Sequence, residues 1–174
     1  MGIQFETDYN METLTAMAKG LRKTVRKKRS RRVHIFAAVV LILGLLTILA
    51  TTAGGEPLGA SGVVTLLAML VVILVSLFED KLNAWFARKR LLPGTEHAVA
   101  TFEEDGYVSA TGVTESRFSY AQIVAVAETE RYFVFALSSH HTQAYDKRNI
   151  RGGSVEHFRA FIAEKTGKLV EDIK

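Results

Sequence analysis

Hydrophobic positions dominate two long stretches of the chain, residues 33–52 and 58–78, and neither stretch contains Lys, Arg, Asp or Glu. Apolar side chains occupy every side of these stretches, whereas a helix that covers a soluble core shows an apolar stripe and a polar back. A helix that crosses a hydrocarbon layer about 30 Å thick needs about 20 apolar residues. The pattern therefore predicts two transmembrane helices, joined by the short linker 53–57.

The alternative for the first stretch is a secretory signal peptide. About 32 residues precede it, and its apolar run exceeds the roughly 7–15 residues typical of a signal-peptide core. We therefore favour a membrane-spanning helical hairpin, which we place at residues 33–92.

The segment before the hairpin, residues 1–32, begins with an alternating pattern at 3–6 that predicts one short strand. Thr7 or Asp8 is then expected to cap a helix. That helix has apolar residues at helical spacing, namely Leu14, Met17, Leu21 and Val25. We expect it to continue with little interruption into the first span, although Gly20 weakens it.

The second apolar helix is likewise expected to continue past the membrane, to about Leu91. Pro93 and Gly94 follow directly, and this pair is typical of a helix end.

Beyond Gly94 the pattern changes to short alternating segments separated by turn residues. These segments predict an antiparallel meander of strands at 97–103, 107–111, 116–120, 122–128, 132–138 and 142–145. Ser154 is expected to cap a final helix that Gly167 ends. Its apolar stripe, formed by Val155, Phe158, Phe161 and Ile162, must be buried against the sheet. The sequence thus predicts an α+β protein with a small antiparallel β domain at 95–174, closed by a C-terminal helix.

The sign of the charge also differs between the segments that flank the apolar stretches and the predicted β domain. The formal net charge is +4, yet residues 91–174 hold nine Lys and Arg against twelve Asp and Glu. Positive charge is instead crowded beside the apolar stretches, whereas the linker between them has no basic residue. Because basic flanks resist translocation, both termini are expected on the cytoplasmic side of the membrane that the hairpin crosses, with the linker outside.

We predict that the basic flanks and one aromatic residue contact anionic lipid headgroups. These residues are Arg22, Lys23, Arg26, Lys27, Lys28, Arg29, Arg31, Arg32, Trp85, Arg88, Lys89 and Arg90. A nucleic-acid partner is not expected. A protein that binds nucleic acid carries its positive charge on the folded domain, whereas the predicted β domain here has more acidic than basic residues.

Candidate catalytic and metal-binding residues are few. The chain has no cysteine, which excludes disulfides and thiolate metal sites. His140 and His141 are adjacent, so on a strand they would point to opposite faces and chelate one metal poorly. Glu103, Glu104 and Asp105 lie in a predicted hairpin turn, where hydrated carboxylates are expected. We predict no catalytic residues, no cofactor and no metal.

The best local binding motif precedes the C-terminal helix. Gly152, Gly153 and Ser154 are placed to direct backbone N–H groups at an anion, and Lys147, Arg148 and Arg151 add positive charge nearby. A plain helix-entry loop with a solvated basic edge is the alternative, because no Walker-type lysine follows the glycines.

The order of elements resembles the YcxB-like family of bacterial membrane proteins. The resemblance rests on four segments, 118–129, 132–135, 144–148 and 158–162. Tyr120 stands where the family usually has an aromatic residue, but 144–148 lacks the proline of the family's Ile-Pro-Lys-Arg segment. The resemblance implies a two-span hairpin followed by a pleckstrin-homology-like (PH-like) domain, and it implies no particular activity.

Two functional hypotheses follow, and a third, a membrane-bound enzyme, finds little support in the sequence. The first is a non-enzymatic membrane protein whose cytosolic domain binds a protein or lipid partner at the bilayer. The second is an immunity protein that meets a pore-forming toxin within the membrane. The spans contain no ionisable residue except His34 at the edge of the first, which argues against a pump or channel. The sequence does not decide whether the protein forms a homo-oligomer, because its only Gly-x-x-x-Gly pair, Gly55 and Gly59, lies at the loop margin.

Overall fold

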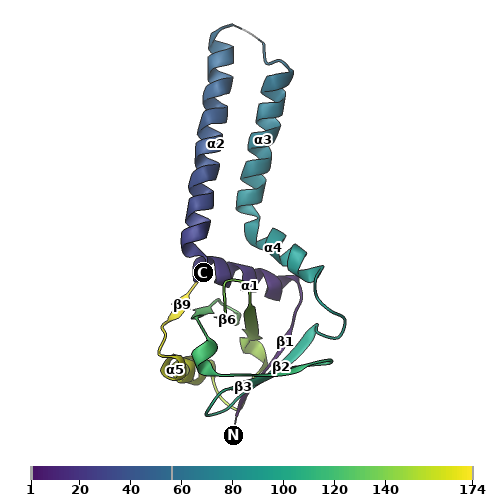
Figure 1. Cartoon of the computed structure of the whole chain (residues 1–174), viewed down its shortest axis with the longest axis vertical. Helices are drawn as coiled ribbons and strands as arrows, with labels where there is room; N and C mark the ends of the chain where they lie inside the picture. The colour runs from purple at the N-terminus through teal and green to yellow at the C-terminus, as the bar shows by residue number, and fades with distance from the viewer. Residues whose placement is uncertain (1, 56, 174) are drawn as a thin grey trace.

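The computed structural model describes residues 2–55 and 57–173 and shows a helical hairpin that projects from a folded α+β body (Figure 1). The helices are α1 (Met11–Lys23), α2 (Lys27–Ala53), α3 (Ala60–Leu77), α4 (Glu79–Arg88) and α5 (Val155–Thr166). The strands are β1 (Ile3–Asp8), β2 (His97–Phe102), β3 (Tyr107–Thr111), β4 (Glu115–Phe118), β5 (Ala125–Glu128), β6 (Tyr132–Ala136), β7 (Thr142–Asp146), β8 (Ile150–Arg151) and β9 (Val170–Asp172). Short 3-10 helices cover Tyr120–Gln122 and Lys147–Asn149.

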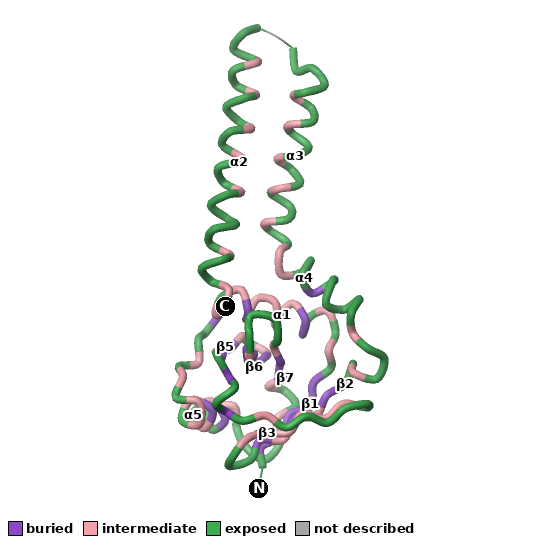
Figure 2. The backbone as a smooth tube through the Cα atoms, viewed as in Figure 1, coloured by how far each residue is buried: buried purple, intermediate pink, exposed green. Residues whose placement is uncertain are grey.

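Helices α2 and α3 form the hairpin, and both are long and apolar enough to cross a membrane. At about 1.5 Å per residue, their 27 and 18 residues span about 40 Å and 27 Å. Their most apolar windows contain no buried residue, and Figure 2 shows exposed positions along both helices. The two predicted apolar helices are therefore present, and the linker between them includes residue 56, which is outside the described residues.

The predicted continuation of the first helix into the span is wrong, and the second helix continues past residue 78, to Arg88, only after a bend. Thr24 ends α1, where its hydroxyl donates to the carbonyl of Gly20 at 2.7 Å, and the chain turns before α2 begins at Lys27. The second helix bends at Phe78, which separates α3 from α4. Both breaks have the same cause, because α1 and α4 pack against each other across the base of the hairpin (Figure 1).

The β domain contains two sheets where a single meander was expected. One has the strand order β4-β3-β2-β1-β8 and the other β7-β6-β5-β9. Each keeps one predicted run of antiparallel neighbours, β2-β3-β4 and β5-β6-β7. The predicted strand at 122–128 begins only at Ala125, because Ser119 caps the preceding 3-10 helix.

The N-terminal strand β1 lies inside the first sheet, which the sequence did not reveal. It pairs antiparallel with β2 over six positions, from Ile3 opposite Phe102 to Asp8 opposite His97. Its other edge pairs with β8. β1 therefore lies between two strands that follow the hairpin in sequence, β2 and β8. The whole hairpin separates it from β2 along the chain.

Aromatic rings fill the space between the sheets and α5. Phe5, Phe102, Phe133 and Phe158 are each no more than 1% exposed, and the rings of Phe5 and Phe158 lie 4.6 Å apart, edge to face. The predicted boundaries of α5 are confirmed, with Ser154 as its N-cap and Gly167 following in the left-handed conformation. Figure 2 shows the buried positions gathered in this body.

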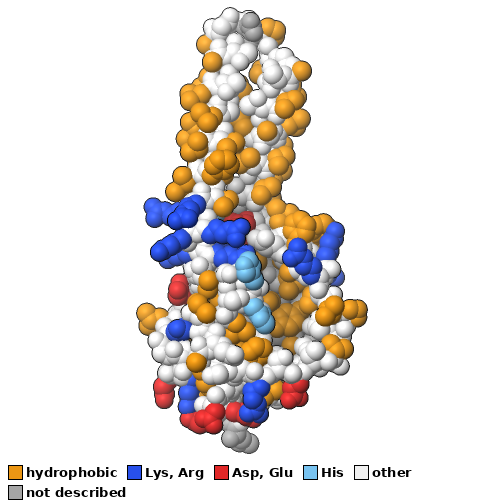
Figure 3. All heavy atoms as spheres, viewed as in Figure 1, with side chains coloured by type: hydrophobic (Ala, Val, Ile, Leu, Met, Phe, Trp, Pro, Cys, Tyr) orange, Lys and Arg blue, Asp and Glu red, His pale blue; other side chains and the backbone are white. Residues whose placement is uncertain are grey.

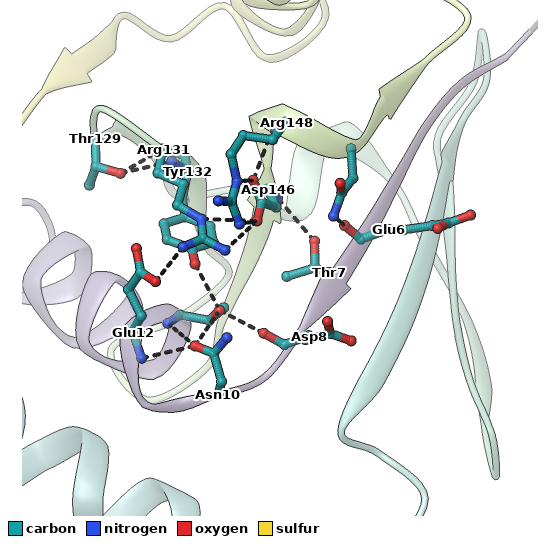
Figure 4. Close-up of polar contacts among 12 residues, drawn as sticks. Glu6, Thr7, Asp8, Asn10, Glu12, Thr129, Arg131, Tyr132, Asp146 and Arg148 are labelled. Carbon is teal, nitrogen blue, oxygen red and sulfur yellow. Dashed lines mark hydrogen bonds and ion pairs between the residues drawn. The ribbon is translucent and has the colours of Figure 1, made fainter.

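Polar contacts fix the start of α1 to the second sheet (Figure 4). The cap is Asn10, whose side chain accepts from the N–H groups of Glu12 and Thr13, so the expected cap at Thr7 or Asp8 is wrong. Thr7 is buried instead, because its hydroxyl accepts from the backbone N–H of Asp146. Arg131 completes the attachment, since it donates to Asp146 and pairs with Glu12.

Candidate functional site

A cleft of about 610 Å³ opens where the hairpin meets the β domain. Its walls come from α1, the first turns of α2, α4 and the turn between β6 and β7. We call it the junctional cleft and define it by the residues Leu14, Met17, Ala18, Leu21, Arg22, Arg26, Arg29, Ser30, Val33, Glu79, Asn83, Phe86, Ala87, Arg90, His140, His141 and Thr142. Sequence reasoning missed it, because it exists only through the breaks at 24–26 and at Phe78.

The floor of the junctional cleft is apolar and its mouth adjoins the apolar hairpin. Leu14 and Leu21 are buried beneath it. Val33, the first residue of the long apolar stretch of α2, and Phe86 on α4 are more than half exposed at its edge. A ligand in this cleft would therefore touch both the folded domain and the start of the hairpin.

An ion pair sets the geometry of one wall. Arg22 on α1 donates to both carboxylate oxygens of Asp80 on α4, at 2.7 and 2.6 Å, and Glu79 lies 3.9 Å from the same guanidinium. The hydrogen bond to Asp80 is the main cause that raises the pKa of Arg22 above its ordinary value. Bidentate Arg–carboxylate pairs have defined orientation, so this contact fixes α4 relative to α1.

The remaining cations of the junctional cleft lack acidic partners. Arg26 donates to the carbonyl of Ser139 at 2.6 Å and to Nδ1 of His140 at 2.9 Å. Within residues 2–55 and 57–173, no carboxylate lies within ion-pairing distance of Arg26, Arg29 or Arg90. The cleft therefore carries excess positive charge.

Ion pairing differs sharply between the belt around the hairpin base and the β domain. We define the basic belt as the Lys and Arg residues of 19–32 and 81–90, and in the described structure Arg22 is its one member with a carboxylate partner. In the β domain the opposite holds, and the ion-paired cations are Arg117, Arg131, Lys147, Arg148, Arg151, Arg159 and Lys165. Figure 3 shows the resulting band of basic side chains between the hairpin and the domain.

The residues predicted to contact headgroups all lie in or beside this band. They are Arg22, Lys23, Arg26, Lys27, Lys28, Arg29, Arg31, Arg32, Trp85, Arg88, Lys89 and Arg90, drawn from the end of α1, the turn after it, the start of α2, α4 and the two residues that follow α4. The ammonium of Lys89 lies 3.5 Å from the centre of the Trp85 ring. Contact with lipid stays a prediction.

The basic residues of the anion site predicted before the C-terminal helix form ion pairs within the protein. Lys147 pairs with Glu128 at 2.9 Å, Arg148 with Asp146 at 3.1 Å and Arg151 with Glu6 at 3.0 Å. An anion would have to compete with these carboxylates.

The adjoining loop, residues 152–154, is also packed against neighbouring groups of the protein. The hydroxyl of Ser154 accepts from the N–H of His157, and Gly152, at φ +79°, lies so close to β1 that an added Cβ would meet the carbonyl oxygen of Gly2 at 2.8 Å. Gly153 lies against the side chain of Ile3. Anion binding at 152–154 stays a prediction.

The candidate acids and histidines form no cluster. Glu103 faces Arg117 at 3.7 Å, and Glu104 pairs with Lys165 on α5. His140 and His141 lie in the turn between β6 and β7, at the junctional cleft. In the part of the chain that the structure describes, no three His, Asp or Glu side chains gather so that they could hold a metal ion.

Comparison with protein families gives one result. Residues 102–162 match the model of the family described as YcxB-like protein. This segment is similar to the YcxB-like family. The predicted resemblance is thereby confirmed for this segment. It runs from the last residue of β2 into α5, so it holds β3, β4 and β8 of the first sheet, β5, β6 and β7 of the second, and neither hairpin helix. No curated protein and no solved structure matches the chain.

Proposed function

We propose that this protein is a non-enzymatic membrane-anchored binding protein. In this proposal α2 and α3 cross the bacterial inner membrane, both termini lie in the cytoplasm, and a PH-like β domain binds a protein or lipid partner at the bilayer surface. The observation that carries it is the basic belt, in which Arg22 alone among the described residues pairs with a carboxylate. The belt lies between an exposed apolar hairpin and a domain whose described cations are almost all ion-paired.

The anchoring part of the proposal follows from exposure and charge. The hairpin presents a continuous apolar surface, which is far larger than the scattered apolar residues of a soluble monomer. Helices satisfy their own backbone groups and are therefore suited to lipid. Unpaired Lys and Arg beside such helices favour the cytoplasmic, anionic side of the membrane.

The binding part of the proposal follows from how the domain is attached. The packing of α1 on α4 and the Arg22–Asp80 pair give the β domain a defined orientation relative to the hairpin. The same face is therefore always turned to the bilayer, and the junctional cleft opens on it. Two sheets that are antiparallel except for the parallel β5–β9 pair, with α5 packed against their core, support a PH-like arrangement.

Cysteine labelling tests the topology cleanly, because the native chain has no cysteine. Leu58→Cys lies in the hairpin loop and Ser116→Cys is exposed on β4. In intact spheroplasts, a membrane-impermeant maleimide is expected to label Leu58→Cys, and to label Ser116→Cys only after lysis. Equal labelling of both variants before lysis would overturn the anchoring.

Partner binding is tested by purifying the full-length protein in detergent after crosslinking in cells. A specific partner should be lost when β-domain surface residues are changed and should persist when hairpin residues are changed. Protection against a membrane toxin that requires α2 and α3, yet survives replacement of the β domain, would support the immunity hypothesis instead.

A further inference from the structure

We propose that the junctional cleft is a binding site for one anionic phospholipid, with the headgroup phosphate between Arg29 and Arg90 and the acyl chains leaving past Val33. The inference rests on the proposed membrane anchoring and goes further, because it names the ligand class and the residues that select it.

Charge is the first reason. The lining contains four arginines and one carboxylate, Glu79, which lies near Arg22 and His34. Arg22 is already engaged by Asp80, and Arg26 lies within hydrogen-bonding distance of the Ser139 carbonyl and of Nδ1 of His140. Two guanidinium groups of the lining, those of Arg29 on α2 and Arg90 just after α4, are left without a partner among the described residues. Guanidinium groups bind phosphate oxygens strongly, through paired charge-assisted hydrogen bonds.

The second reason is the change from polar to apolar lining along the junctional cleft. Its floor is formed by aliphatic side chains of α1, whereas its edge includes Val33 and Phe86, both more than half exposed. In Figure 3 the basic band lies directly between apolar surface on the hairpin and apolar surface on the domain. A molecule with a charged head and an apolar tail matches this order.

Size and position favour a lipid over a free anion. A volume of about 610 Å³ far exceeds what an inorganic phosphate fills, and it falls within the range of sites that hold drug-sized molecules. The rim at Val33 is where the apolar stretch of α2 begins, so acyl chains would pass directly into the hydrocarbon of the proposed bilayer.

Lipid retention by the purified full-length protein tests the proposal. The protein is incubated in mixed micelles with equal amounts of phosphatidylglycerol and phosphatidylcholine, separated from free lipid, and its bound lipid is quantified by mass spectrometry. The unaltered protein should retain phosphatidylglycerol in preference. Arg29→Gln with Arg90→Gln should reduce that retention by at least about tenfold.

A matched control separates the cleft from the general positive charge of the belt. Lys19→Gln with Lys81→Gln removes the same charge from belt residues that do not line the cleft and are not among the predicted headgroup contacts, and it should leave retention within about twofold. Equal loss in both double variants would overturn the proposal. Arg29→Lys with Arg90→Lys keeps the charge and should retain more lipid than the Gln variant, which shows that misfolding is not the cause.

Competition distinguishes the lipid from a free anion. Inorganic phosphate at millimolar concentration should not displace the retained phosphatidylglycerol, and full displacement would mean that the site recognises phosphate alone. Because the assay is done in micelles, it reports on the cleft independently of the labelling result for membrane topology. A lipid-binding cleft and a wrong topology would therefore be told apart.

Discussion

Glu128 on β5 is a carboxylate that two cations from different parts of the chain enclose. Lys147 donates to it at 2.9 Å from the segment after β7, and Arg159 donates from α5 at 2.7 and 2.8 Å. Burial alone raises the pKa of Glu128, but the hydrogen bonds from Arg159 and Lys147 outweigh that effect and the pKa falls below its ordinary value. Lys147 is thus a structural residue of the β domain, whatever else its patch binds.

The lowered pKa predicts how stability depends on pH. The folded pKa of Glu128 is below the unfolded one, so the stabilisation is present above pH 4.5 and is lost as the pH falls through the folded pKa. Glu128→Gln should cost about 2 kcal/mol at pH 7 because two cations lose their charged acceptor. The difference from the unaltered protein should shrink in acid.

Chemical unfolding of the full-length protein in detergent, followed by near-UV circular dichroism at pH 7 and pH 3, measures this difference. Glu130→Gln removes the same charge from an exposed position two residues away and serves as the control. A Glu128→Gln effect that is equal at both pH values would contradict the assignment.

At the scale of elements, α1 is the piece that joins the hairpin to the β domain. Gly20 allows its close approach to the second sheet, since an added Cβ would lie 2.6 Å from Cγ1 of Val134 on β6. From the sequence alone, this glycine was expected only to weaken the helix. The structure gives it a packing role against β6.

Gly20→Ala should therefore destabilise the protein by about 1–2 kcal/mol, although the same change favours an isolated helix by about 1 kcal/mol. Val134→Ala in the same chain should restore part of the loss by making room for the new methyl group. Thermal unfolding of the single and double variants measures the coupling. Gly59→Ala, where an added Cβ meets nothing within 4 Å, is the control, and additive effects of the two changes would rule out the contact.

Elements whose pattern is local were predicted well, and those that depend on distant partners were not. The two apolar helices, most strands and both ends of α5 follow from periodicity, turn residues and caps. The breaks at 24–26 and Phe78 depend on α1 packing against α4, and the key pair, Arg22 and Asp80, is 58 residues apart in the chain. The junctional cleft was missed for the same reason, whereas its basic residues were predicted as a group from composition.

For the whole molecule, the Arg22–Asp80 pair controls how firmly the β domain is held to the hairpin. Both side chains are mostly shielded from water, at 22% and 16% exposure, so the pair is stronger than a surface ion pair. Losing it frees α4 from α1 without touching either sheet. The domain would then reorient relative to the hairpin.

Arg22→Ala should increase amide hydrogen exchange across α4 by about tenfold, which corresponds to about 1.4 kcal/mol, with little change in the sheets. Exchange measured by mass spectrometry on the full-length protein in detergent reports this directly. Combining Arg22→Asp with Asp80→Arg should restore much of the protection. Arg31→Ala changes a belt cation with no described ion pair and is the matched control. An equal increase of exchange across α4 in this variant would show that the Arg22–Asp80 pair does not specifically hold α4.

The pairing of β1 with β2 has a consequence for biogenesis. These strands exchange hydrogen bonds along six residues, yet the proposed bilayer crossing is encoded between them. In a chain that inserted only one of its two apolar helices, β1 and β2 would lie on opposite sides of the membrane. They could not pair, and the first sheet would not form. In the proposed topology, the first sheet forms only in chains whose β1 and β2 lie on the same side of the membrane, so a folded sheet indicates that both apolar helices crossed the bilayer or that neither did.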